Sequence, residues 1–266
     1  PRPVRRPGVA RPLADAREAD YDRYFGIART PDVPVGTLVE ALRSATSEVA
    51  AFAPESTEPA VRAGLAVCGL APPGPSDRVD DSPLGRWRAG HRLFFALIQA
   101  TVVALRGAAA VGTASHPAPG DTRGAATLLA ACAAAMRLTA SFSPHAYGHL
   151  VRPSMAPPQR DLDGFSGLWS ADHRALVGHL RTWGRAHREA CSGRCPSLDE
   201  LSGALAEVHG AHHGICARFV GAQPSLLGTD DDALRTLIRL NTNRSRLLQP
   251  PGHTPVEAGT TPRSAP

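Results

Sequence analysis

The residues with the clearest potential for chemistry are a histidine and a cysteine four positions apart, His212 and Cys216. They lie in segment 201–219, LSGALAEVHGAHHGICARF, whose apolar residues recur at steps of three and four. This spacing predicts an apolar helical stripe with His212 at its centre and Cys216 one turn later on the same face. A histidine in such a stripe is suited to axial ligation of haem iron, and the neighbouring Gly210 and Gly214 leave room for a flat group.

The same pattern is compatible with other interpretations. His209 and His213 compete for the ligand role, although helical geometry turns them about 60–100° away from the stripe. A single histidine on an apolar helix face is more often a hydrogen-bonded core residue than a ligand, and Cys216 by itself also fits a small apolar core residue. Periodicity alone therefore leaves the haem hypothesis open.

The elements that must position these residues are all helical. Apolar residues repeat at helical spacing, or alanine is frequent, in segments 37–52, 86–105, 123–142, 171–191, 197–220 and 229–248. Stretches rich in Pro and Gly at 71–83, 112–121 and 153–163 are typical of loops. No alternating Val/Ile-rich run indicates a strand. We therefore expect an all-α helical bundle in one domain, residues 13–249, with disordered tails at 1–12 and 250–266.

Composition excludes several classes of protein. All 29 basic residues are arginine, and no basic patch interleaved with aromatic residues indicates nucleic-acid binding. No apolar run approaches the roughly 18–20 residues of a membrane span, and the first residues do not resemble a signal peptide. The 5 cysteines argue against a secreted disulfide scaffold, so we expect a cytoplasmic protein. His187, Cys191 and Cys195 lack the usual zinc spacing and a fourth ligand.

Four stretches together resemble the histidine-ligated haem-dependent aromatic oxygenases, the superfamily of tryptophan and indoleamine 2,3-dioxygenases. They are RAGHRLFFALIQ (88–99), PHAYGHLVR (144–152), AHHGICARFV (211–220) and LGTDDDALRTLIRL (227–240). No single stretch is specific, but their order and separation match that superfamily. The resemblance implies a tryptophan-dioxygenase-like helical bundle that encloses a haem, with His212 as the iron ligand.

The resemblance also implies roles for four residues outside that helix. His91 stands at the position of a distal histidine, where an imidazole can take a proton from peroxide or from a substrate phenol. Arg152 matches an arginine that pairs with the substrate carboxylate, Tyr147 an aromatic wall of the pocket, and Thr229 a Gly-Thr turn near the substrate amine. From the residues alone, His91 also fits a helix-surface histidine, Arg152 a loop arginine and Tyr147 a core tyrosine.

A narrower resemblance is to the 3-methyl-L-tyrosine hydroxylases of saframycin biosynthesis. They carry a haem motif His-x(n)-His-x-x-x-Cys, with n near the 38 residues that here separate His173 from His212. Cys216 completes the motif. This resemblance implies a haem attached through one thioether to Cys216, and it places His173 in the cofactor site as ligand, distal partner or support.

The function that the resemblance implies is a haem peroxygenase of antibiotic biosynthesis. It would convert 3-methyl-L-tyrosine to 3-hydroxy-5-methyl-L-tyrosine with hydrogen peroxide as co-substrate. The alternatives are an L-tyrosine 3-hydroxylase giving L-DOPA, an indole-cleaving dioxygenase, a non-catalytic haem sensor or carrier, and a helical interaction protein without a cofactor. The expected partner is a small amino-acid substrate, with no nucleic acid and no membrane, and the superfamily suggests a homodimer.

Overall fold

The computed structural model describes residues 10–27, 35–52, 59–111, 119–221, 226 and 233–248, apart from 75, 77, 78, 163 and 191–194. Within these residues the regular structure consists of helices, without a strand, so the predicted all-α class is confirmed. Thr229 and the segment 250–266 lie outside the described residues, and so does most of the predicted N-terminal tail.

The regular elements follow one another as α1 (Ala10–Phe25), α2 (Val35–Phe52), α3 (Pro59–Val67), α4 (Pro83–Val111), α5 (Pro119–Thr139), α6 (Pro144–Ala146), the π-helical turn η2 (Tyr147–Val151), α7 (Arg152–Ser154), the 3-10 turn η3 (Gly167–Trp169), α8 (Ala171–Ala190), α9 (Pro196–Phe219) and α10 (Ala233–Ser245). All six predicted helices are present. The prediction missed α1 and α3. Helix α1 begins at Ala10, inside the segment expected to be a tail, because a proline such as Pro12 is tolerated in the first turn of a helix.

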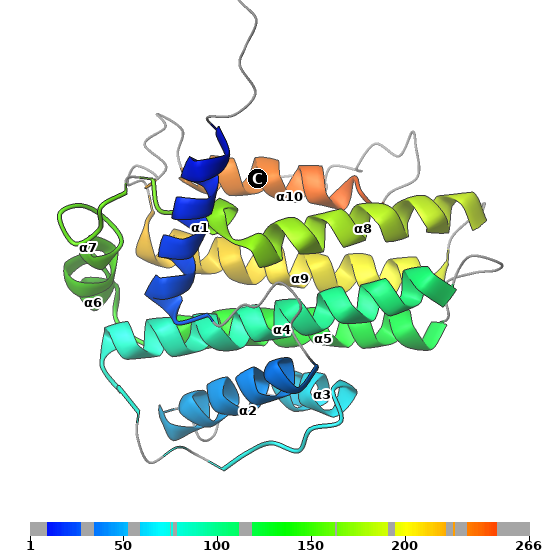
Figure 1. Ribbon diagram of the computed structural model, residues 1–266, viewed down its shortest axis with the longest axis horizontal. Helices are drawn as coiled ribbons and strands as arrows, with labels where there is room; N and C mark the ends of the chain where they lie inside the picture. Colours follow the sequence, from blue (N-terminus) through cyan, green and yellow to red (C-terminus); the bar gives the residue numbers. More distant parts are fainter. Residues whose placement is uncertain are drawn as a thin grey trace, which may run out of the picture.

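The long helices stack in layers around a central pair. Helices α4 and α5 pack against each other, with α2 contacting α4 and α3 contacting α5 on one side. On the other side α8 contacts α4 and α9 contacts α5, and α10 lies beyond them against α9 (Figure 1). The turns α6, η2 and α7 lie together at one end of the bundle (Figure 1). The predicted cofactor motif is thus carried by α8 and α9, between the central pair and α10.

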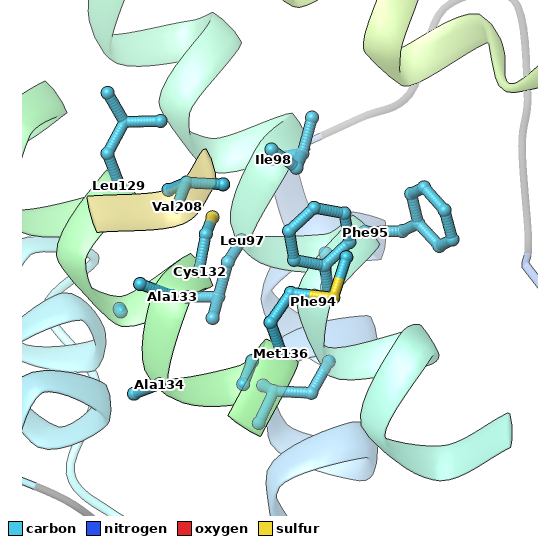
Figure 2. Packing of buried hydrophobic residues seen from close by; sticks show 14 of the residues in the cluster. Phe94, Phe95, Leu97, Ile98, Leu129, Cys132, Ala133, Ala134, Met136 and Val208 are labelled. Carbon is cyan, nitrogen blue, oxygen red and sulfur yellow. The ribbon is translucent and has the colours of Figure 1, made fainter. Parts of the chain in front are cut away.

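Small residues let the central helices approach closely. Figure 2 shows large side chains of α4, among them Phe94 and Leu97, against the alanine-rich surface of α5. A Cβ added to Gly90 of α4 would lie 2.8 Å from Cγ2 and 2.9 Å from Cα of Thr139 on α5. Because these distances are shorter than van der Waals contact, the crossing of α4 and α5 requires glycine at position 90.

Helix α4 corrects the expectation that no segment is long and apolar enough to cross a membrane. Over residues 83–109 it contains an 18-residue window of mean hydropathy 1.4. By length and composition, this helix is apolar enough to cross a membrane. The bent pair Thr122–Thr139 and Pro144–Ser154 passes the same test. The expectation failed because it looked for an uninterrupted apolar run. Within the bundle 56% of the α4 window is buried, as in the core helix of a globular domain.

Candidate cofactor and substrate site

Helix α9 carries the predicted haem motif near its C-terminal end. The apolar stripe is confirmed, since Leu201, Leu205, Val208, Ile215 and Phe219 are buried, while His212 and Cys216 are half-buried. The helix ends where the backbone N–H groups of Val220 and Gly221 donate to the Cys216 carbonyl oxygen, at 2.8 and 3.0 Å. Gly221 has a φ of +53°, a conformation that favours glycine after a helix. The motif cysteine is therefore fixed in the closing turn of α9.

His209, which is predicted to point away from the stripe, nevertheless lies in the interior. Its side chain is buried, and neither ring nitrogen has a hydrogen-bond partner. Helix α9 packs against α5 on one side and α10 on another, so its buried surface is wider than a single stripe. Burial, together with the charge of Arg244, lowers the pKa of His209 to about 4. His213, by contrast, is exposed as expected.

A cavity of about 370 Å³ lies between α9, α10, η2 and the segment that leads into α8. It brings together five of the seven predicted site residues, which are Tyr147, Arg152, His173, His212 and Cys216. His209 and Arg244, which the sequence prediction did not include, also line it. Thr229 lies outside the described residues.

Helix α10 covers this cavity. None of its residues is fully buried, yet seven of its thirteen residues line the hollow, which are Ala233, Thr236, Leu237, Ile238, Leu240, Asn241 and Arg244. Ile238 and Leu168, both exposed, give the cavity an apolar mouth. A helix whose inner face covers a hollow rather than packed side chains indicates room for a bound group.

His173 is held in the first turn of α8 with one ring nitrogen facing the protein backbone. Its Nδ1 lies 3.0 Å from the carbonyl oxygen of Gly167, and because a carbonyl only accepts, Nδ1 carries the hydrogen. The lone pair is thus on Nε2, as in histidines that bind metals. Phe94 and Phe95 flank the ring, each with its centroid 5.6 Å from that of the imidazole. Burial, together with Arg244, lowers the pKa of His173 to about 3.

His91 is buried, so a helix-surface histidine is excluded. Its Nδ1 donates to the Trp87 carbonyl oxygen at 2.8 Å, and its ring stacks on Phe25 with centroids 4.4 Å apart. His91 does not line the larger cavity. It lines a separate cavity of about 40 Å³, which also reaches His212 and Cys216. The structure therefore places His91 and His173 in two different cavities that both touch His212.

Tyr147 and Arg152 are brought to one face by the π-helical turn. The Arg152 backbone N–H donates to the Tyr147 carbonyl oxygen five residues earlier. In an α-helix, residues five apart point about 140° away from each other, whereas the wider turn brings them round to the same side. Pro153 follows directly and has no N–H with which to continue an α-helical ladder. Both side chains line the larger cavity, as the substrate prediction requires.

Tyr147 is a packed wall of the cavity rather than an ionisable group. Its ring stacks on Phe219 with centroids 4.8 Å apart and an angle of 5° between the planes. Burial raises the pKa of the Tyr147 hydroxyl to about 12, against the opposing effect of the neighbouring Arg152. The phenol therefore stays protonated near neutral pH.

The histidines fit a haem. Burial lowers the pKa of His91 and His173 to about 3 and that of His212 to about 4, so all three are neutral near pH 7. Neutral imidazole is the form that binds iron. Among the described residues no group of three or more His, Cys, Asp or Glu can hold a bare metal ion. A porphyrin needs only one or two protein ligands, which this site offers.

The possible zinc residues remain apart from this site. His187 is buried with its ring 5.0 Å from that of Trp183, and Cys195 is buried without a disulfide. Cys191 lies outside the described residues.

Comparison with known proteins identifies the family of the chain. The profile of a family described as SfmD 3-methyl-L-tyrosine peroxygenase matches residues 1–200 of the chain. The chain belongs to this family. The matched range includes His91, Tyr147, Arg152 and His173 and ends before the haem motif of α9.

One curated relative of the SfmD family is the 3-methyl-L-tyrosine peroxygenase of Streptomyces lavendulae. It is 32% identical to the chain over 165 residues, which are 60% of this chain and 44% of the relative. The match thus spans less than half of the relative's length. No solved structure gives a significant match.

Proposed function

We propose that the protein is a haem-dependent peroxygenase that uses hydrogen peroxide to convert 3-methyl-L-tyrosine to 3-hydroxy-5-methyl-L-tyrosine. One observation supports this most directly. A single cavity is lined by neutral imidazoles, a cysteine, an arginine and a tyrosine, in a chain of the SfmD family. This arrangement suits a cofactor beside an amino-acid substrate, as in the tryptophan dioxygenase superfamily. The proposed setting is antibiotic biosynthesis in the cytoplasm.

His212 and His173 would hold the cofactor. Both line the larger cavity, both are neutral, and His173 has its Nε2 lone pair available. We assign His212 as the ligand of the iron. His173 lies in the same cavity, where the Nε2 atom of His173 can bind the iron or accept a proton from peroxide or phenol. The bound haem would activate peroxide and supply the oxygen atom that enters the ring. Because His91 lines only the smaller cavity, it is the secondary candidate for proton transfer.

Cys216 would attach the haem. Burial raises the pKa of its thiol to about 11, so the sulfur remains protonated near neutral pH. Cys216 would supply the S–H group for a thioether to a haem vinyl group, with the thiol hydrogen going to the neighbouring vinyl carbon. The addition consumes no oxidant. Cys216 lines the same cavity one helical turn after His212, which is consistent with a vinyl group within its reach.

Arg152 and Tyr147 would form the substrate end. The Arg152 guanidinium can bind the amino-acid carboxylate through two parallel hydrogen bonds, and the buried Tyr147 ring offers an apolar wall. Thr229 is retained as the proposed contact of the substrate amine.

The test is a competition between substrates. Haem-loaded protein receives hydrogen peroxide and equal amounts of 3-methyl-L-tyrosine and L-tyrosine, and mass spectrometry follows the gain of one oxygen atom in each. We expect hydroxylation of the methylated substrate to dominate. Preferential formation of L-DOPA would favour the L-tyrosine hydroxylase. Haem binding without any product would favour a haem sensor or carrier.

A further inference from the structure

Arg244, near the C-terminal end of α10, is a cation without an anionic partner among the residues that the structure describes. It is half-buried and lines the larger cavity, and burial lowers the pKa of its guanidinium. No ion pair or hydrogen bond joins its side chain to another of the described residues. None of the described residues that line the cavity is Asp or Glu, so the cavity wall carries two cationic side chains, Arg152 and Arg244, and no anionic one.

The physical cost of this arrangement indicates a missing ligand. A guanidinium withdrawn from water costs free energy unless an anion compensates for it. The charge of Arg244 also lowers the pKa of His173, His209 and His212, so the guanidinium lies close to all three imidazoles. Arg244 thus destabilises the empty cavity and makes it attractive to an anion.

A second unpaired group lies beside it. Both ring nitrogens of the buried His209 lack a hydrogen-bond partner, and Asn241 approaches the ring without hydrogen-bond geometry. His209, Asn241 and Arg244 all line the larger cavity. Together they offer a charged fork and neutral N–H donors, a combination that suits a planar carboxylate.

We propose that Arg244, assisted by His209, binds a carboxylate of a group that fills the larger cavity, at an anion site separate from Arg152. This inference rests on the proposed function, because that function supplies two carboxylate-bearing groups, the haem with its propionates and the amino-acid substrate. The recognised chemistry is the same for both.

The first measurement separates this role from a structural one. Arg244→Gln removes the charge but keeps a polar side chain of similar reach. Because the unpaired charge destabilises the empty site, we expect the haem-free variant to have a melting temperature equal to or above that of wild type. Arg235→Gln, at an exposed position of the same helix, is the control. A clearly lower melting temperature for haem-free Arg244→Gln alone would show that Arg244 stabilises the fold, and it would overturn the proposal.

The second measurement identifies the carboxylate. In one arm, haem-free protein is titrated with haem and with haem dimethyl ester, whose propionates are neutral. In the other, haem-loaded protein is titrated with 3-methyl-L-tyrosine and with the corresponding amine that lacks the carboxyl group. In one of the two arms, we expect Arg244→Gln to reduce the preference for the ligand with a free carboxylate over its neutral counterpart at least about tenfold. That arm identifies which group, haem or amino acid, supplies the carboxylate.

Each remaining outcome is decisive. Wild-type preference retained by Arg244→Gln in both arms would overturn the carboxylate site and leave the proposed function intact. A wild-type protein that binds neither haem nor the amino acid would instead contradict the proposed function, and this proposal with it.

Discussion

The imidazoles around His212 differ in how their rings are held. His91 and His173 each donate from Nδ1 to a backbone carbonyl oxygen, whereas His212 has no hydrogen bond to the described residues. Among the described residues, packing alone orients His212. A bound iron would supply the contact that fixes its ring.

His212→Ala should therefore lose most of the haem or show a changed Soret band, while His213→Ala, at an exposed position, should retain the wild-type spectrum. Absorption spectra and haem content of the purified variants measure the effect. If His212→Ala keeps the wild-type spectrum and His209→Ala loses haem, the iron ligand is His209.

Arg152→Leu should weaken amino-acid binding at least about tenfold, because a charge-assisted bidentate contact is lost. Haem content should not change. Substrate titration of the haem-loaded protein measures the affinity, and Arg185→Leu on the exposed side of α8 provides the control. Equal affinities for wild type and Arg152→Leu would remove Arg152 from the substrate site.

Acidic acetone should fail to extract haem from the wild-type protein, whose intact mass should exceed that of the bare chain by one haem. Cys216→Ser should release the haem, because serine does not form the thioether. Cys68→Ser, outside both cavities that Cys216 lines, should behave as wild type. Complete extraction from wild type would leave Cys216 as a core thiol.

At the scale of elements, the sequence predicts the helices whose apolar spacing is long and regular, and it fails where packing decides. Helix α3 has only nine residues, too few for a clear period. The burial of His209 depends on where α10 packs, which the spacing within α9 does not encode. One feature of the sequence could have pointed to Arg244 as a site residue. It lies four residues after Leu240, and therefore on the same face of α10, which lines the cavity. Helical spacing predicts that His212 and Cys216 share a face, whereas the place of His173 beside them came from the family resemblance.

The crossing of α4 and α5 can be tested with one added methyl group. Gly90→Ala places a Cβ within 2.8–3.0 Å of Thr139, so we expect a loss of about 1–3 kcal/mol in the free energy of unfolding. Gly107→Ala in the same helix meets open space and should be neutral or slightly stabilising. Urea denaturation measures both variants. Equal stabilities would mean that the two helices can separate at this level without cost.

At the scale of the whole molecule, buried neutral histidines make stability depend on pH. In the unfolded chain they titrate near a pKa of about 6.5. In the folded protein the pKa is about 3 for His91 and His173 and about 4 for His209 and His212. Between these values the unfolded chain binds more protons. The stabilisation is therefore complete above about pH 6.5 and is lost as the pH falls toward the folded pKa values.

The haem-free protein should consequently have a lower free energy of unfolding near pH 5 than near pH 7, by about 1.4 kcal/mol per pH unit for each such histidine. Urea denaturation at the two pH values measures the difference. A stability that is flat over this range would show that the four imidazoles are protonated in the folded protein.

The π-helical turn between Tyr147 and Arg152 has a consequence for ancestry. Such a turn results when one residue is inserted into an α-helix whose two ends are already held, here by the Tyr147–Phe219 stack and by the Tyr24 hydroxyl, 2.7 Å from the Ser154 hydroxyl. Deleting one residue, such as the exposed Gly148, would restore a regular helix and turn Arg152 away from Tyr147. The deletion of a single codon would therefore leave a bundle that retains its helices and its histidines but lacks the paired arginine and tyrosine of the proposed substrate site.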